Sequence, residues 1–134
     1  MSQENVEVVG EIIAAWNADG LDAMLRFLPE DVVWYPFPEW PDGAAARTGH
    51  DGVSELMGAW TDSFDEWTTE AQEIRDLGDR VLVLGAIAGR IKGSGVPIRQ
   101  PLGYVCSDFR GGQMGEAHFF LTWKEALEAA GLSE

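Results

Sequence analysis

Apolar residues recur every three or four positions in the first half of the chain, a spacing that predicts helices with one buried face. The first predicted helix begins at a Ser2 cap and stops near Asn17, and a shorter second helix begins at an Asp19 cap and ends at Pro29. A third helix follows Gly52. The apolar stripes of the three helices are Val6, Val9, Ile13 and Trp16; Leu21, Met24, Leu25 and Leu28; and Val53, Leu56, Met57, Trp60 and Phe64.

Strand patterns occupy the segment before the third helix and most of the chain after Trp67. Gly85 and Gly89 interrupt a long apolar strand, which predicts a bulge or bend there. Thr122 and Glu125 form a capping box for a C-terminal helix. The predicted strands cover residues 31–37, 67–77, 80–91, 96–109 and 113–121. Helices followed by a meander of strands is the α+β order, and we expect a single domain spanning residues 1–134.

The chain is strongly acidic, with 23 acidic residues against 9 basic ones and a formal net charge of -14. Nucleic acid phosphates and anionic membrane surfaces attract basic proteins, so we expect neither as a partner. The single Cys106 cannot form an internal disulfide and fits a reducing compartment. The N-terminus lacks the apolar core of a signal peptide, and no apolar run is long enough to span a membrane. A cytoplasmic location is therefore expected.

A set of short motifs follows the order in which they occur in one known family. They are Asn5 with the helix through Trp16-Asn17, residues 29–34 (Pro-Glu-Asp-Val-Val-Trp), residues 49–53 (Gly-His-Asp-Gly-Val), residues 78–83 (Gly-Asp-Arg-Val-Leu-Val), residues 89–96 (Gly-Arg-Ile-Lys-Gly-Ser-Gly-Val) and residues 125–132 (Glu-Ala-Leu-Glu-Ala-Ala-Gly-Leu). Together they span nearly the whole chain. By this ordered set the sequence resembles the SnoaL-like branch of the nuclear transport factor 2 superfamily.

The resemblance implies a cone-shaped α+β fold, in which three or four N- and C-terminal helices close a curved antiparallel sheet around an apolar cavity. Relatives include ketosteroid isomerases, polyketide cyclases, epoxide hydrolases, dehydratases and non-catalytic binding or transport modules, and they are often homodimers. We therefore expect a homodimer that takes a small apolar molecule and needs no cofactor. The fold does not fix the function, because the chemistry depends on a few cavity side chains.

Two departures from the family pattern bear on the mechanism. Polyketide cyclases carry an acidic general acid/base near the end of the last strand, and the alignment places Thr122 there. The tyrosine and carboxylic acid that form the oxyanion hole of the isomerases have no convincing counterpart in this chain. Any acid/base group must therefore lie elsewhere.

His118 and Glu116, on the last strand, are the candidates for acid/base chemistry. Strict alternation places both on one face with Met114, Phe120 and Thr122, and such a mixture of polar and large apolar groups is expected of a pocket wall. A carboxylate two residues from a histidine can orient the ring and favour its protonated form. In the alternative interpretation this face meets solvent or a dimer partner.

Aromatic side chains and the second histidine are the candidates for binding a ligand. The alternative for the tryptophans is core packing, and for the tyrosines a buried ring with a satisfied hydroxyl. For the second histidine it is a capping or packing residue at the start of the third helix. The expected ligand-binding residues are Trp16, Trp34, Tyr35, Trp40, His50, Trp60, Tyr104 and Phe120. Two distant histidines and one cysteine lack the spacing of metal ligands, so no metal site is expected.

Three functions fit these patterns. The first is a cofactor-free isomerase, cyclase or hydrolase that acts on an apolar ligand by acid/base chemistry. The second is a non-catalytic module that binds a hydrophobic ligand, which the loss of an acidic group at Thr122 favours. The third is a homodimerising module whose interior is filled by tryptophans. A cavity of about 300 Å³ or more is the size typical of ligand pockets and separates the first two from the third.

Overall fold

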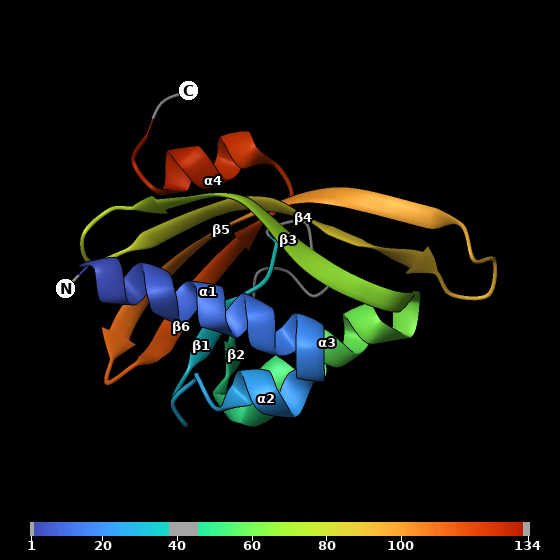
Figure 1. Ribbon diagram of the computed structural model, residues 1–134, viewed down its shortest axis with the longest axis horizontal. Helices are drawn as coiled ribbons and strands as arrows, with labels where there is room; N and C mark the ends of the chain where they lie inside the picture. The colour runs from blue at the N-terminus through green and yellow to red at the C-terminus, as the bar shows by residue number, and fades with distance from the viewer. Residues whose placement is uncertain (1, 38–45, 133–134) are drawn as a thin grey trace.

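A curved sheet of six strands forms the centre of the computed structural model, which describes residues 2–37 and 46–132 (Figure 1). The helices are α1 (Ser2–Asp19), α2 (Leu21–Leu25), α3 (Gly49–Ser63) and α4 (Trp123–Ala129). In spatial order the strands are β2 (Arg47–Thr48), β1 (Val33–Tyr35), β6 (Gln113–Phe120), β5 (Pro97–Arg110), β4 (Val81–Ile91) and β3 (Phe64–Asp76). Only β1 and β6 pair in parallel. The expected α+β fold with a curved sheet is confirmed.

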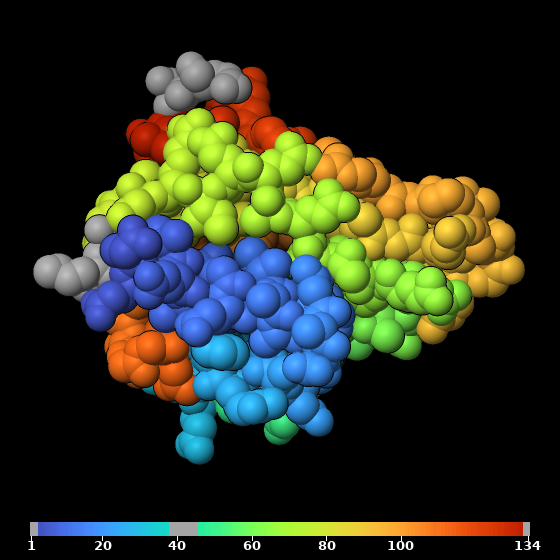
Figure 2. Space-filling model, viewed as in Figure 1, coloured from blue at the N-terminus to red at the C-terminus, as the bar shows by residue number. Residues whose placement is uncertain are grey.

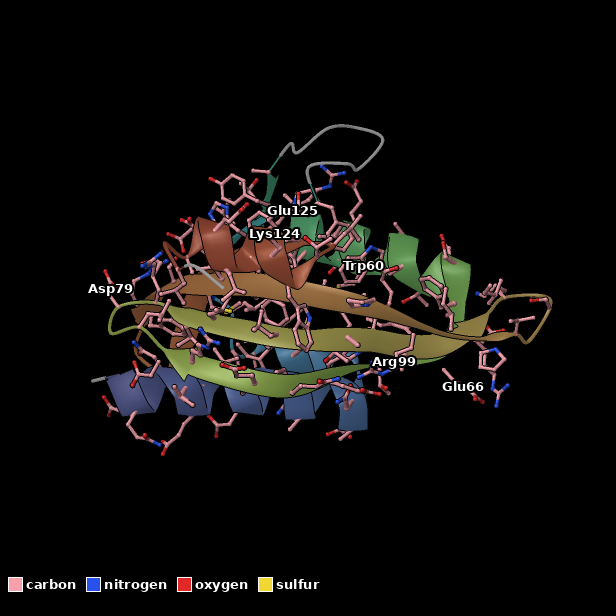
Figure 3. The ribbon with its side chains drawn as sticks, turned by 90° about the horizontal axis from the view of Figure 1, so that it is seen from above. Trp60, Glu66, Asp79, Arg99, Lys124 and Glu125 are labelled. Carbon is pink, nitrogen blue, oxygen red and sulfur yellow. The ribbon has the colours of Figure 1, made fainter. Side chains whose placement is uncertain are left out.

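The sheet is covered on both faces, which we call inner and outer. Helices α1, α2 and α3 pack on the inner face, whereas α4 packs on the outer face (Figures 1 and 3). Strand β4 contributes side chains to the cores on both faces. Val81 and Val83 point into the inner core, and Leu82 and Leu84 point into the core beneath α4. A strand buried on both faces needs no polar alternation, which explains its continuous apolar sequence.

The two glycines of β4 allow the neighbouring strand β3 to pack against it at very short range. A Cβ on Gly85 would lie 1.8 Å from the carbonyl oxygen of Glu70, and one on Gly89 would lie 2.8 Å from Cβ of Trp67. The pairing of β3 with β4 shifts register at both places. The expected irregularity is therefore confirmed, but the extra residues lie on β3, and Glu66 there adopts a positive φ of 52°.

Several helix boundaries differ from the expected ones. Helix α1 continues through Asp19, so this residue does not cap α2; Gly20 stands at that position with φ 85° and no side-chain cap. Helix α2 ends at Leu25, well before Pro29. Helix α3 begins at Gly49, ahead of the expected start, because the Gly49 N–H donates to the carbonyl of Val32 at 2.7 Å and fixes the turn there.

Strand β2 was not expected from the sequence. It holds only two residues and pairs antiparallel with β1, Val33 opposite Thr48 and Trp34 opposite Arg47. A pattern of two residues cannot show strand periodicity, so only its partner reveals it. The long β4–β5 hairpin, in contrast, agrees with expectation and projects beyond the helices (Figures 1 and 2).

Both ends of α4 are fixed by its own sequence. The Thr122 hydroxyl oxygen accepts from the N–H of Glu125 at 3.1 Å, as a helix cap should. At the other end the N–H of Leu132 donates to the Leu127 carbonyl and that of Gly131 to the Glu128 carbonyl, which is a Schellman motif.

A side-chain hydrogen bond attaches α4 to the sheet. Trp123, the first residue of the helix, donates its indole N–H to the carbonyl of Gly85 at 2.9 Å. The cap and this bond together place α4 across β4 and β5 on the outer face, so it does not close the interior that α1, α2 and α3 cover.

Candidate functional site

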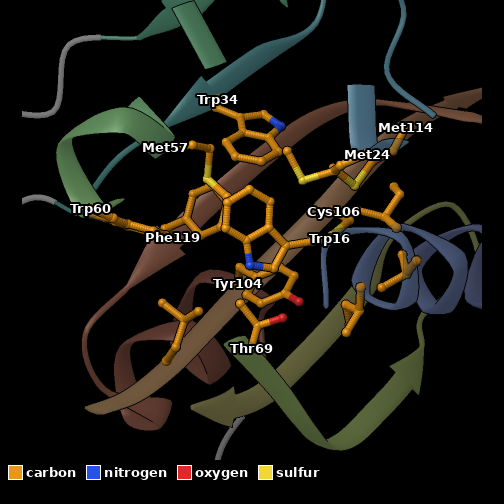
Figure 4. Close-up of a pocket in the computed structure, with 14 residues that line it drawn as sticks. Trp16, Met24, Trp34, Met57, Trp60, Thr69, Tyr104, Cys106, Met114 and Phe119 are labelled. Atoms are coloured by element: carbon orange, nitrogen blue, oxygen red, sulfur yellow. The ribbon is translucent and has the colours of Figure 1, made fainter. Parts of the chain in front are cut away.

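A pocket lies between the inner face of the sheet and helices α1, α2 and α3 (Figure 4). Its volume is about 50 Å³, enough for roughly three or four water molecules. The pocket is therefore well below the 300 Å³ typical of ligand sites, and by the criterion of size this volume favours the homodimerising module with a filled interior. The lining residues are Val9, Ile12, Ile13, Trp16, Met24, Trp34, Met57, Trp60, Thr69, Leu102, Tyr104, Cys106, Met114 and Phe119.

None of the described residues that line the pocket carries a carboxylate, an imidazole or a basic side chain. Its ionisable groups are the phenol of Tyr104 and the thiol of Cys106. Burial raises the pKa of the Tyr104 hydroxyl, with a smaller contribution from the nearby Cys106, and burial raises the pKa of the Cys106 thiol. Both groups are therefore neutral at neutral pH, and the lining residues offer hydrogen bonds and apolar contact but no ready proton acceptor.

Aromatic rings build much of the wall and hold one another in place. Trp34 and Tyr104 pack against Phe119 with ring centroids 5.0 and 5.3 Å away, and Trp16 packs against Trp67 at 4.6 Å. Trp60 meets Trp67 edge to face at 5.5 Å. Such contacts contribute about 0.5–1.5 kcal/mol each beyond their burial. They fill most of the interior, which accounts for the small cavity.

Asn17 fixes the end of α1 that carries Trp16. Its side-chain amide donates to the Thr69 carbonyl at 2.9 Å and accepts from the Thr69 N–H at 3.0 Å. This two-bond contact sets the distance between α1 and β3. Trp16 and Thr69 consequently line the same pocket from opposite elements.

Two tryptophans that line the pocket, Trp16 and Trp34, have buried indole nitrogens with no hydrogen-bond acceptor among the described residues. Two other tryptophans do have one: Trp67 donates to the Thr61 hydroxyl at 3.2 Å and Trp123 to the Gly85 carbonyl. Because buried N–H groups are nearly always paired, the two unpaired ones are exceptional.

Glu116 and His118 lie together but on the outer face of β6, away from this pocket. Nε2 of His118 is 2.7 Å from Oε2 of Glu116, and the imidazole stacks on the ring of Tyr35 at 4.2 Å. Their side chains are 40% and 36% exposed. The sequence correctly suggested that the two groups interact, but the structure does not place them in a pocket wall.

The backbone of Asp108 explains why Met114 does not share a face of β6 with Glu116 and His118. This residue adopts a positive φ of 58° opposite Gly115, where the pairing of β5 with β6 is interrupted. Before the interruption Cys106 pairs with Ala117 on the inner face; beyond it Met114 also lies in the inner core. Simple alternation puts Met114 with Glu116 and His118, and is wrong here because the strand changes face.

The remaining expected ligand-binding residues divide into two groups. Trp16, Trp34, Trp60 and Tyr104 line the pocket. Tyr35 and Phe120 do not: Tyr35 stacks on the histidine of the outer pair, and Phe120 packs in the core beneath α4. Trp40 lies outside the described residues.

His50 is also outside the pocket. Its Nε2 lies 2.8 Å from the carbonyl oxygen of Leu28 and therefore carries the proton that it donates. The bond ties the start of α3 to the segment after α2, in a surface groove that also includes Pro29, Asp31 and Arg110. The packing alternative for this histidine agrees with that position.

Sequence reasoning missed most of the aliphatic and sulfur-containing wall. Phe119 and Ala117 alternate as small and large apolar residues, and this is the signal that identifies the inner face of β6. Met24 and Met57 lie on the predicted helical stripes, where core packing and pocket lining look alike.

Among the described residues no three His, Cys, Asp or Glu side chains gather as metal ligands would, and none of the described helices is long and apolar enough to cross a membrane.

A curved antiparallel sheet with helices covering an apolar interior defines the nuclear transport factor 2-like class of folds. A profile of the SnoaL-like domain matches residues 9–116 of this sequence, and the chain belongs to that family. A search of functionally curated proteins finds no significant match.

Solved structures share the fold over almost the whole chain. A protein with a ketosteroid isomerase-like fold from Catenulispora acidiphila, crystallised in complex with trimethylamine, is 21% identical with a TM-score of 0.72, covering 94% of this chain and 93% of the other. A putative polyketide cyclase from Xanthomonas campestris pv. campestris is 23% identical with a TM-score of 0.70, covering 92% and 93%. TerC, co-crystallised with polyporic acid, is 18% identical with a TM-score of 0.75, covering 93% and 98%. At these identities the likeness is one of fold.

Proposed function

We propose that this SnoaL-like protein binds a small, uncharged and predominantly apolar molecule in the pocket beneath α1. The observation that carries the proposal is the character of the wall: it is aromatic, and none of the described residues that line it is charged at neutral pH. An apolar pocket with a few polar groups is the usual form of a small-molecule site. A charged ligand would lose its hydration there without gaining a partner ion.

Binding requires the pocket to expand, because 50 Å³ admits only a few atoms. The wall can change shape at three methionines, Met24, Met57 and Met114. Methionine has an unbranched side chain that changes rotamer at low cost and adapts to irregular shapes. A ligand that displaces these side chains replaces thioether contacts by contacts of its own.

Thermal unfolding with small probes tests the proposal. Toluene and cyclohexanone should raise the Tm of the wild-type protein in proportion to their concentration. Met57→Phe, which fills part of the cavity, should weaken this effect, whereas Leu84→Met, in the core beneath α4, should not. If no probe raises the Tm, the interior is an ordinary core and the fold serves another purpose, such as the homodimerising module.

Native mass spectrometry of the purified protein provides a second measurement. A co-purifying mass that disappears on denaturation would identify the ligand directly. The same spectrum tests the expected homodimer, which stays a prediction.

Acid/base catalysis by Glu116 and His118 is the second candidate function. The specific observation in its favour is their 2.7 Å hydrogen bond, with the imidazole stacked on Tyr35 and half-exposed to solvent. In this arrangement the carboxylate orients the ring, and the imidazole removes a proton from a substrate that docks on the outer face of β6.

Deuterium exchange at the α-carbon of cyclohexanone, followed by NMR, measures such proton transfer. His118→Ala should abolish any exchange above the buffer rate, and Glu116→Gln should reduce it. Met57→Phe should leave it unaltered, because the pocket is on the other side of the sheet. Equal rates for His118→Ala and the wild type would exclude this role.

A further inference from the structure

The tryptophans near the core differ in whether their indole N–H groups have a protein acceptor. Trp67 and Trp123 donate to a hydroxyl and to a carbonyl, at 3.2 and 2.9 Å. Trp16 and Trp34 line the pocket, and their nitrogens are buried with no acceptor among the described residues. The fold therefore pairs the two described indoles outside the pocket lining, those of Trp67 and Trp123, and leaves unpaired two of those on residues that line it.

An unpaired buried N–H is costly, because it has given up its hydrogen bond to water. Phenylalanine at either position would keep an aromatic ring in the wall without burying a polar atom, so aromatic packing by itself does not require the indole N–H. An acceptor brought by a bound molecule would restore the missing hydrogen bonds. Among the described residues of the lining, Thr69 and Tyr104 carry hydroxyls, and none carries a carboxylate that could accept from the indoles.

We propose that Trp16 and Trp34 are the hydrogen-bond donors of the binding site, and that its ligand is an apolar molecule bearing carbonyl or ether oxygens. This inference rests on the proposed function and names its ligand class. The hydroxyls of Tyr104 and Thr69 also line the pocket, and Figure 4 shows their oxygens on the same side of the Trp16 ring as its nitrogen.

The balance of donors and acceptors discriminates between ligand classes. An alcohol or a primary amine can accept from an indole but must also place its own O–H or N–H, for which the side chains of the described lining offer only hydroxyl oxygens and sulfur atoms. A pure hydrocarbon would leave both indoles unpaired. A ketone, ester or lactone accepts from the indoles and places its carbon skeleton against the aromatic and methionine side chains.

Cyclohexanone and methylenecyclohexane test the inference, because they have nearly the same shape and differ in an acceptor oxygen. Titration of each into ¹⁵N-labelled protein follows the indole N–H resonances. Cyclohexanone should shift the Trp16 and Trp34 resonances downfield, and methylenecyclohexane should not. The paired indoles of Trp67 and Trp123 serve as internal controls and should show no downfield shift with either compound.

Trp16→Phe and Trp34→Phe complete the test. Each variant should weaken the binding of cyclohexanone relative to that of methylenecyclohexane. The ratio of the two dissociation constants should change roughly two- to tenfold, the effect of one lost hydrogen bond. Trp123→Phe should leave that ratio unchanged. Thermal unfolding establishes that each variant is folded; if one is not, the indole shifts of the wild-type protein still decide.

The outcomes separate this inference from the proposed function. Binding of both compounds with unmoved indole resonances and an unchanged ratio would overturn the assignment of the donors and leave the pocket as a binding site. If neither compound binds, both the inference and the proposed function are overturned.

Discussion

The carbonyl of Glu70 lies directly against Gly85, so closely that a Cβ at Gly85 would be 1.8 Å from its oxygen. Neither group can move aside cheaply, because both belong to paired strands at the point where β3 changes register. Gly85→Ala should therefore destabilise the protein by about 3 kcal/mol or more, or prevent folding. Urea unfolding followed by circular dichroism measures the change.

Gly58→Ala is the matched control for that substitution. Gly58 lies in the exposed middle of α3, and a Cβ there meets nothing within 4 Å. The same added methyl should stabilise the protein by about 0.5–1 kcal/mol, because alanine favours the helix and restricts the unfolded chain. Similar losses for both variants would show that β3 and β4 are not as close as described.

Met57→Ala should enlarge the pocket at a cost in stability. Met57 lines it and is 4% exposed, and removing such a side chain costs about 2–5 kcal/mol. Toluene should restore part of this loss by occupying the new space. Leu127 lies on the buried face of α4 and is also 4% exposed, and Leu127→Ala should lose a similar amount without recovery on adding toluene. Recovery in both variants would show that toluene acts non-specifically.

Asp31 and Arg110 join the segment before β1 to the end of β5 through a 2.9 Å hydrogen bond. This bond lowers the pKa of Asp31 below its ordinary value of 3.8. The ion pair consequently contributes stability at pH values above about 4, and that contribution is lost as the pH falls through the lowered pKa of the folded state.

Asp31→Asn should therefore reduce the Tm slightly at pH 7, and the difference from the wild type should disappear at low pH. Asp79→Asn is the control, because Asp79 pairs only with its neighbour Arg80 and at 3.8 Å. A Tm difference for Asp31→Asn that persists at pH 2 would mean that charge pairing is not its cause.

Local sequence signals predicted much of the fold. The caps at Thr122 and Gly131 depend on residues close in sequence, and both appear where expected. The irregularity at Gly85 was also expected, but its extra residue lies on β3. The face of β6 could not be predicted in the same way. It depends on the positive φ of Asp108, a residue on another strand, which moves Met114 inward while Glu116 stays outside.

The candidate site was predictable only in part, for a similar reason. Helical periodicity identifies Trp16 and Trp60 as inward-facing, but it does not distinguish a packed core from a pocket. That distinction depends on the space left between packed rings, and those rings come from distant parts of the sequence, as in the contacts of Trp16 with Trp67 and of Trp34 with Phe119. The side of the sheet that α4 covers was likewise undetermined, since its amphipathic face fits either side.

Cys106 offers a probe of pocket opening, because it lines the pocket and is fully buried. Thiol reagents attack the thiolate, and burial raises the pKa of Cys106 above its ordinary value of 9.0. The folded protein should thus react very slowly at pH 8, through transient opening. The same shift predicts that stability falls as the pH rises above about 9, since the unfolded chain loses its thiol proton first.

The reaction with 5,5′-dithiobis(2-nitrobenzoate), followed by absorbance, measures this opening. We expect slow modification of the wild-type protein, rapid modification in urea, and further slowing by toluene if the pocket admits it. The double variant Cys106→Ser, Ser107→Cys is the matched control, because residue 107 lies on the outer, partly exposed side of β5 opposite Glu116. Its thiol should react rapidly and independently of toluene. Rapid reaction of Cys106 in the wild type at pH 8 would mean that the interior is open to solvent. The proposal that the pocket binds an apolar molecule would then be wrong.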